Sequence, residues 1–134
     1  MKNLRRNKGF TLIEMLIVIV IIGLLLSLVA PNLMGGADKA KRQVASAQLK
    51  NIETALETFY LDVGQYPESL SELMQSTKTG WSGPYMKKAV PNDPWGKPFV
   101  YRSPGDDGKP YYLASYAQDG QQGGDGEAKD IVYP

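Results

Sequence analysis

The sequence predicts an α+β fold in which one long N-terminal helix packs on a small antiparallel β-sheet. Residues 10–30 form an almost unbroken apolar run, and residues 37–63 carry an apolar stripe with helical spacing. The remainder is rich in glycine, proline and aromatic residues, with short β-prone runs between turn signals. A chain of 134 residues has room for one domain and one appended segment.

The apolar run from Phe10 to Ala30 is long enough to cross a bilayer as a helix, because about 20 residues span roughly 30 Å. Residues 1–9 carry four basic side chains and no acidic one, so this end is predicted to stay in the cytoplasm and the body to lie outside it. A cleaved secretory signal is the less favoured alternative, because Glu14 interrupts the run and Pro31 follows its end. A plain signal anchor stays open.

The second helical stretch, residues 37–63, has a 4-3-4-3-4 spacing of apolar residues that predicts one buried face. That stripe consists of Ala45, Leu49, Ile52, Leu56, Phe59 and Val63. Pro31 and the pair Gly35-Gly36 predict a kink or local melting between the two stretches. Tyr66-Pro67 is expected to end the helix.

The C-terminal half predicts a short helix and three short strands. The helix is expected at Glu68–Met74, within a helix-and-loop segment 67–98, and the strands at Phe99–Arg102, Tyr111–Ser115 and Ile131–Tyr133. These strands are too few and too short to bury a core alone, so we expect the stripe of the long helix to form the other half of the core.

Composition excludes several classes of function. The chain has neither histidine nor cysteine, which removes Ser-His-Asp, thiol, iron-sulfur and His-zinc chemistry as well as disulfides. The formal net charge is +1, and it becomes −3 without the four basic residues of the head, so nucleic-acid binding is not expected. Without a nucleophile and base pair, the chain is predicted not to be an enzyme.

Glu14 is an acid inside an apolar run, which is costly in a membrane unless the side chain has a partner. If the chain were cut between Gly9 and Phe10, the new α-amine could pair with Glu14 of a neighbouring chain. Alternatively, Glu14 reaches the interface from the first helical turn. Position alone leaves both interpretations open.

The stretch Gly9-Phe10-Thr11-Leu12-Ile13-Glu14, after a basic head and before an apolar helix, resembles the type IV pilin and pseudopilin signature. The resemblance implies that a prepilin peptidase cuts between Gly9 and Phe10 and that Phe10 becomes N-methylated. It gives Glu14 a role in assembly. Residues 1–9 are then a leader, 10–31 a transmembrane and filament-core helix, and 32–134 a periplasmic domain.

The body is similar to the major pseudopilins of type II secretion, on Tyr66-Pro67, Gly83-Pro84-Tyr85, Pro91–Gly96 and Ser115–Gly120. This resemblance implies a pilin fold and a subunit that polymerises into a periplasmic filament driving the export of folded proteins. The implied partners are further copies of the chain, minor pseudopilins, the prepilin peptidase and an inner-membrane assembly platform. The implied location is the inner membrane, crossed once, with the body in the periplasm.

The acidic loop between Ser115 and Asp130 contains oxygen donors and glycines that could curl around one calcium ion. Its acidic residues are Asp119, Asp125, Glu127 and Asp130. Spacing alone also fits a solvated turn. The family resemblance implies one bound Ca²⁺, held by the carboxylates of Asp119, Asp130 and Asp125 and by the backbone carbonyls of Tyr116 and Gln121.

The sequence is also compatible with two alternative functions. The chain could be a subunit of an adhesive or competence type IV pilus, although many such pilins close a disulfide that this cysteine-free sequence lacks. It could also be a monomeric, signal-anchored calcium-binding domain that forms no polymer.

Overall fold

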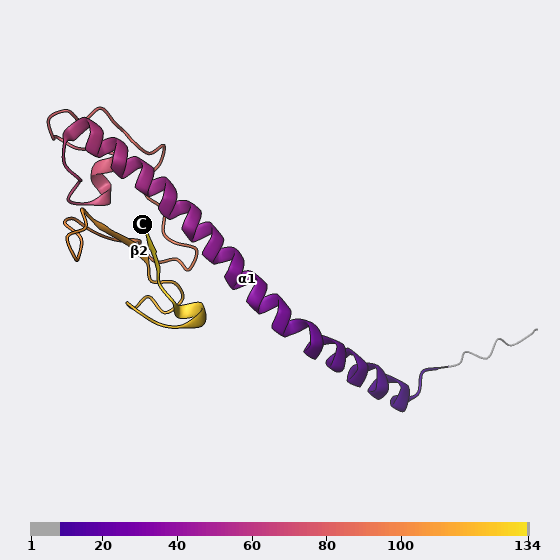
Figure 1. Cartoon of the computed structure of the whole chain (residues 1–134). Coiled ribbons are helices and arrows are strands. Elements are labelled where there is room, and N and C mark those ends of the chain that lie inside the picture. The colour runs from indigo at the N-terminus through magenta and orange to yellow at the C-terminus, as the bar shows by residue number, and fades with distance from the viewer. Residues whose placement is uncertain (1–8, 134) are drawn as a thin grey trace, which may run out of the picture. The chain divides into compact units, whose positions relative to one another are not determined.

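The structure is a computed structural model that describes the backbone of residues 9–133 and the side chains of residues 9–28 and 35–133. Its elements in order are helix α1 (Leu12–Val63), 3₁₀ helix η1 (Leu70–Leu73), strands β1 (Val100–Arg102) and β2 (Tyr112–Ser115), 3₁₀ helix η2 (Gly126–Ala128) and strand β3 (Ile131–Tyr133). Figure 1 labels α1 and β2. The chain divides after Ala37 into two compact units. The predicted α+β class is confirmed.

Helix α1 runs without interruption from Leu12 to Val63, through Pro31 and the pair Gly35-Gly36. The local melting expected there is therefore absent from the described backbone. A proline removes one backbone donor, and the hydrogen bonds on either side can carry a long helix across one such position. Over the stretches that the structure describes, no helix combines the length and hydropathy needed to cross a membrane. Residues 1–8 of the predicted leader lie outside the described residues, as do the side chains of residues 29–34 at the end of the predicted transmembrane segment.

The C-terminal end of α1 is set by glycine rather than by the Tyr66-Pro67 pair. Gly64 has a φ of +82°, and its N–H donates to the carbonyl oxygen of Tyr60 at 2.8 Å. Glycine adopts this left-handed conformation without a steric penalty, which makes it the common residue just past a helix end. The helix therefore stops at Val63, and the short helix predicted at 68–74 forms as the 3₁₀ helix η1 within that range.

The three strands form one antiparallel sheet in the order β1-β2-β3. Tyr101 of β1 lies opposite Leu113 of β2, and Ala114 of β2 lies opposite Val132 of β3. The central strand is the most buried, with Leu113, Ala114 and Ser115 all at 0% exposure. All three strands were predicted within one residue of their observed bounds.

The core lies between one face of α1 and the sheet. The predicted stripe is buried, with Ala45, Leu49, Ile52, Leu56 and Phe59 at 0% exposure and Val63 partly buried at its end. From the other side, the buried side chains of Leu73, Phe99, Tyr111 and Leu113 complete the same cluster. Burying one large apolar side chain contributes about 1.5–3 kcal/mol, so the helix stripe and the short strands depend on each other for stability.

Candidate functional site

The N-terminal segment of α1 exposes nearly all of its large apolar side chains. Fifteen such residues between Phe10 and Leu28 are 46–82% exposed in the single chain. They occur all round the helix rather than on one stripe, which is typical of a helix surrounded by lipid or by other helices. Within the unit before Asp38, this surface is the candidate assembly site.

Glu14 and Thr11 cap the start of α1. The Thr11 N–H donates to Glu14 Oε2 at 2.7 Å, and the Glu14 N–H donates to Thr11 Oγ1 at 3.3 Å. This reciprocal pair is a capping box, which satisfies two backbone donors at the helix start. The sequence signal is Thr-x-x-Glu directly before an apolar run, a local pattern from which this cap was not predicted. In the uncut chain Glu14 thus has a local partner.

The predicted cleavage point lies just ahead of this cap. Gly9 and Phe10 are both exposed, Phe10 at 82%, and they precede the first helical residue, Leu12. Among the described residues, no atom lies within 4 Å of the position that a Cβ on Gly9 would occupy. Apart from its two chain neighbours, the described residues therefore leave the space beside Gly9 open.

The acidic C-terminal loop brings Asp119 and Asp130 into hydrogen bonds with backbone of the same loop. Asp119 Oδ1 accepts the N–H of Gln121 at 3.0 Å, and Asp130 Oδ2 accepts the N–H of Gly123 at 2.8 Å. The second oxygen of Asp130, Oδ1, is buried and has no hydrogen-bond partner in the described structure. A buried carboxylate oxygen without a partner is costly, and a bound cation would satisfy it.

The other predicted ligands differ in their surroundings. The carbonyl oxygen of Tyr116 accepts the N–H of Gly120 at 3.1 Å, and that of Asp125 accepts the N–H of Ala128 at 3.1 Å. Asp125 precedes η2, and its side chain makes no capping hydrogen bond there. Gln121 is exposed. Within the described part of the chain, no three acidic side chains gather closely enough to hold a metal by carboxylates alone.

These residues fit a calcium ion only if backbone carbonyls supply part of its shell. Calcium takes six to eight oxygens and accepts carbonyl ligands, so two carboxylates with carbonyls are a reasonable donor set. Glycines with positive φ curl the loop at Gly120, Gly123, Gly124 and Gly126. The unpartnered Asp130 Oδ1 is the observation of this structure that favours a cation at this loop.

Two basic side chains, for which no such role was predicted from the sequence, hold the acidic loop through hydrogen bonds to its backbone. Arg42 on α1 donates from Nη1 to the carbonyl oxygen of Lys129 at 2.9 Å. Lys97 donates from Nζ to the carbonyl oxygen of Gln118 at 2.6 Å. Both contacts join positions more than 20 residues apart, so neither residue could be assigned this role from local sequence pattern.

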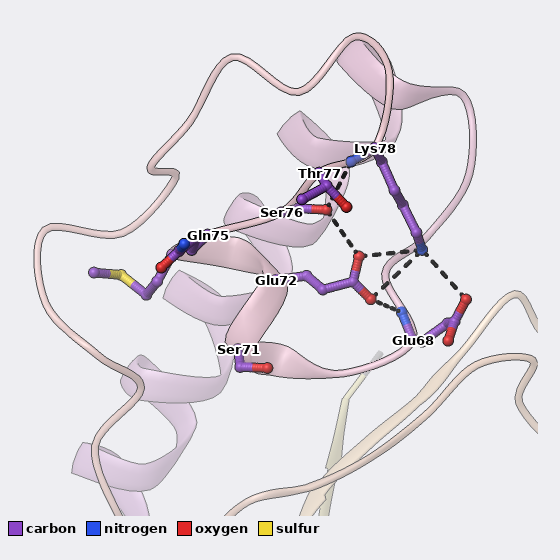
Figure 2. Close-up of a pocket in the computed structure, with 8 residues that line it drawn as sticks. Glu68, Ser71, Glu72, Gln75, Ser76, Thr77 and Lys78 are labelled. Carbon is purple, nitrogen blue, oxygen red and sulfur yellow. Dashed lines mark hydrogen bonds and ion pairs between the residues drawn. The ribbon is translucent and has the colours of Figure 1, made fainter.

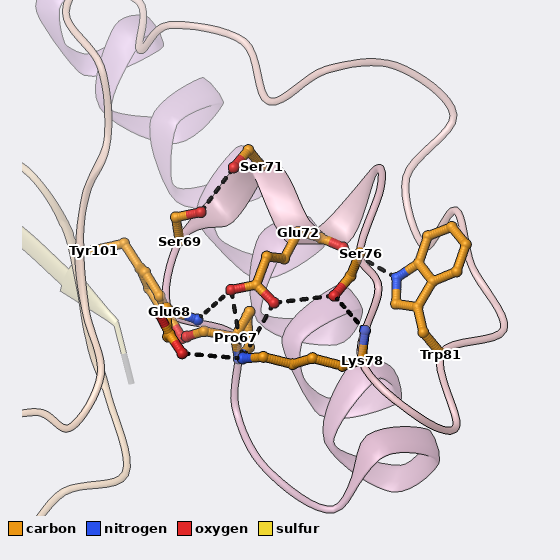
Figure 3. A network of polar contacts seen from close by, with 9 residues as sticks. All are labelled: Pro67, Glu68, Ser69, Ser71, Glu72, Ser76, Lys78, Trp81 and Tyr101. Atoms are coloured by element: carbon orange, nitrogen blue, oxygen red, sulfur yellow. Dashed lines mark hydrogen bonds and ion pairs between the residues drawn. The ribbon is translucent and has the colours of Figure 1, made fainter.

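A network of polar side chains lies in the segment that comes after α1 in the sequence. It lines an open cleft of about 630 Å³ (Figure 2). Lys78 Nζ lies 3.1 Å from Glu72 Oε2 and 3.7 Å from Glu68 Oε1. Burial raises the pKa of Glu72, but hydrogen bonds from the Glu68 N–H, Lys78 and Ser76 together hold that pKa below its usual value. The indole N–H of Trp81 donates to the Glu72 carbonyl oxygen at 3.0 Å (Figure 3). These bonds join η1 to the loop that follows it.

Two family models match this chain, one over the body and one over the N-terminal segment. Residues 32–133 match the family "Type II secretion system (T2SS), protein G", and residues 4–30 match the "Prokaryotic N-terminal methylation motif". Type II secretion system core protein G of Xanthomonas campestris is 42% identical over 127 residues, covering 93% of this chain and 88% of that protein. The Vibrio cholerae protein of the same name is 39% identical over 139 residues, covering 98% and 94%.

A solved structure is also similar. It is the crystal structure of the major pseudopilin from the type 2 secretion system of enterohaemorrhagic Escherichia coli. That structure is 30% identical to this chain, with a TM-score of 0.57, and the match covers 76% of this chain and 93% of that one. The chain therefore belongs to the type II secretion system protein G family, and its role is that of a major pseudopilin, a structural subunit and not an enzyme.

Proposed function

We propose that this chain is cut between Gly9 and Phe10 by a prepilin peptidase, methylated on Phe10, anchored in the inner membrane through residues 10–31, and assembled into a periplasmic filament. The observation that carries the proposal is the exposure of fifteen large apolar side chains between Phe10 and Leu28. Fully burying such a side chain contributes about 1.5–3 kcal/mol, and because these are 46–82% exposed, each would forgo part of that contribution if left in water. Lipid covers them before assembly, and further copies of the same helix cover them in the filament.

Glu14 guides the register of that assembly. Once the chain is cut, Phe10 carries a new α-amine, and this cation can pair with the Glu14 carboxylate of the next subunit. The capping role of Glu14 can be separated from its charge, because glutamine also serves at the Glu position of a capping box. Glu14→Gln is expected to keep the helix cap and lose assembly, whereas assembly at the wild-type level would discard the charge pair.

Crosslinking through introduced cysteines tests the filament directly, because the sequence contains no cysteine of its own. Leu16→Cys and Leu25→Cys chains, produced together in a host with the matching secretion system, place thiols at two depths of the apolar helix. A helical array brings staggered depths of neighbouring subunits together, so mixed Leu16–Leu25 crosslinks are expected. A signal-anchored monomer gives none, and a simple parallel dimer gives crosslinks between equal depths only.

We further propose that the loop 116–130 binds one calcium ion in the periplasm. Asp119 and Asp130 each have one oxygen occupied by a backbone N–H and one left for a ligand, and the free oxygen of Asp130 is buried. Asp125 and the carbonyl oxygens of Tyr116 and Gln121 supply the further donors. Binding would order a glycine-rich loop that has little apolar content, so metal binding and folding of the C-terminal region are linked.

We propose the remaining partners from family membership. Minor pseudopilins are expected at the filament tip, and an inner-membrane platform is expected to add subunits at its base. In this account the growing filament moves folded proteins toward the outer membrane. The competing pilus alternative predicts filaments on the cell surface at native expression and unchanged export when the chain is deleted.

A further inference from the structure

The motif Pro91–Gly96 forms a tight turn around a buried carboxylate. Asp93 is 4% exposed, and its Oδ1 accepts the N–H groups of Trp95 at 3.1 Å and Lys97 at 2.8 Å. The N–H of Asp93 in turn donates to the carbonyl oxygen of Lys97 at 2.7 Å. The two ends of the turn, Asp93 and Lys97, are thereby fixed to each other.

The same turn is joined to the start of the acidic loop. Ser115 Oγ donates to Asp93 Oδ2 at 2.6 Å and accepts the N–H of Ala117 at 3.2 Å. Ser115 is the last residue of β2, and Ala117 has a φ of +48°, a conformation that residues with a side chain rarely adopt. Asp93 therefore fixes, through Ser115, the point where the chain leaves the sheet and enters the loop.

Lys97 makes a second connection, farther along the loop. Its Nζ donates to the carbonyl oxygen of Gln118 at 2.6 Å. Its side chain also fills the space beside Gly120, where an added Cβ would lie 2.6 Å from Nζ and 2.8 Å from Cδ. Gly120 has a φ of +69°, a backbone conformation that favours glycine, and its lack of a Cβ leaves room for the end of the Lys97 side chain.

We propose that Lys97 is a positioning residue for the calcium loop, held in place by the turn that Asp93 organises. The inference rests on the proposed calcium binding at residues 116–130. Lys97 fixes Gln118 and Gly120 on either side of Asp119, so that the Asp119 carboxylate and the carbonyl oxygen of Tyr116 are in place before the ion arrives. A site that is ordered in advance loses less conformational entropy on binding and binds more tightly.

The charge of Lys97 and its positioning role predict opposite effects of its removal on calcium affinity. An ammonium group close to a calcium site repels the cation, so its removal would strengthen binding if charge alone mattered. If positioning dominates, removal frees the loop and weakens binding. Lys129 is the matched control, because it is the neighbour of Asp130 in the sequence. Its backbone N–H and carbonyl oxygen make hydrogen bonds that do not depend on its ammonium group.

The experiment is a calcium titration by calorimetry on the full chain in detergent micelles, comparing wild type with Lys97→Met, Lys97→Arg and Lys129→Met. We expect Lys97→Met to raise the calcium Kd at least fivefold, Lys97→Arg to stay within twofold of wild type, and Lys129→Met to leave the Kd equal or lower. A Kd for Lys97→Met that is equal to or lower than that of wild type overturns the proposal.

A metal-free measurement separates this proposal from the calcium role itself. Without calcium, Lys97→Met is expected to speed hydrogen exchange of the Gly120 and Gln121 amides, while amides of β2 exchange at the wild-type rate. If wild type binds no calcium, the calcium function fails whatever the exchange data show. If wild type binds calcium but exchange in the loop is unchanged in Lys97→Met, the positioning role fails alone.

Discussion

The hydroxyl group of Tyr101 donates a hydrogen bond to the backbone carbonyl oxygen of Pro67 at 2.8 Å, across 34 positions of the chain. Tyr101 lies in β1 and Pro67 in the turn that follows α1, so this bond joins the sheet to the end of the long helix. Burial raises the pKa of Tyr101 to about 12, so the hydroxyl keeps its proton at neutral pH and remains a donor.

Tyr101→Phe removes this bond and leaves a carbonyl oxygen without its partner. A hydrogen bond of this kind contributes about 0.5–1.5 kcal/mol to folding, and we expect a loss of that size in the free energy of unfolding. Fluorescence of Trp81 and Trp95 during denaturation measures it. Tyr60→Phe is the control, because Tyr60 is 44% exposed and packs by ring stacking on Tyr66. Equal losses in both variants would contradict the role given to Tyr101.

The core prediction concerns Phe59, the largest fully buried side chain on the helix stripe. Phe59→Ala is expected to cost about 3–5 kcal/mol, because the residues around the missing ring can close the cavity only in part. Leu61→Ala, two positions away on the same helix and 80% exposed, is expected to change stability by less than about 0.5 kcal/mol. Similar losses in a denaturant titration would mean that the stripe is not the core face.

Asp62 near the end of α1 gives the folded state a pH dependence. Hydrogen bonds from the hydroxyl groups of Ser82 and Tyr85 hold the pKa of Asp62 below its ordinary value. A carboxyl group with a lowered folded-state pKa stabilises the fold above its unfolded pKa, near 4, and that contribution is lost as the pH falls through the folded-state pKa. Stability is therefore expected to fall below about pH 4.

Asp62→Asn checks this assignment, because an amide does not titrate in that range. The decrease in melting temperature between pH 5 and pH 3 is expected to be smaller in Asp62→Asn than in wild type. Glu57→Gln, at an exposed position five residues earlier on α1, is the matched control and should keep the wild-type decrease. An unchanged slope in Asp62→Asn would show that the Ser82 and Tyr85 bonds have no part in it.

Calcium linkage gives the next prediction. Asp119→Ala is expected to lower the melting temperature of the C-terminal region when calcium is present and to change it little in chelator, because only the metal-bound state uses the free Asp119 oxygen. Scanning calorimetry in both conditions measures the difference. Equal losses with and without calcium would assign Asp119 to its hydrogen bond with Gln121 and discard the metal role.

Much of the fold could be predicted from periodicity and turn residues alone. The stripe from Ala45 to Val63 and the three strands were predicted from the 3.6-residue spacing and from turn signals, since both are local properties of the sequence. The local melting near Pro31 was not seen, because intrinsic propensity is a weak guide inside a long helix. The helix ends before Tyr66-Pro67 because Gly64, the residue directly after Val63, adopts the left-handed conformation that terminates a helix.

The site was harder to predict because its contacts are distant in sequence. Asp93 and Ser115 lie 22 positions apart, and Arg42 and Lys129 lie 87 apart. No local pattern relates such pairs, although Pro91–Gly96 was among the segments that carry the family resemblance. The Thr11–Glu14 capping box, in contrast, is a local pattern of Thr-x-x-Glu before an apolar run and could have been predicted from the sequence.

The central claim is that the chain is cut between Gly9 and Phe10 and then assembles through the apolar helix that follows the new N-terminus. The most direct measurement is the intact mass of the chain from the membranes of a host carrying the matching prepilin peptidase, with fragment ions covering the N-terminus. The account predicts loss of residues 1–9 and one added methyl group on Phe10. An uncut chain, or a chain cut after Ala30, would contradict it and would favour a signal anchor or a secreted domain instead.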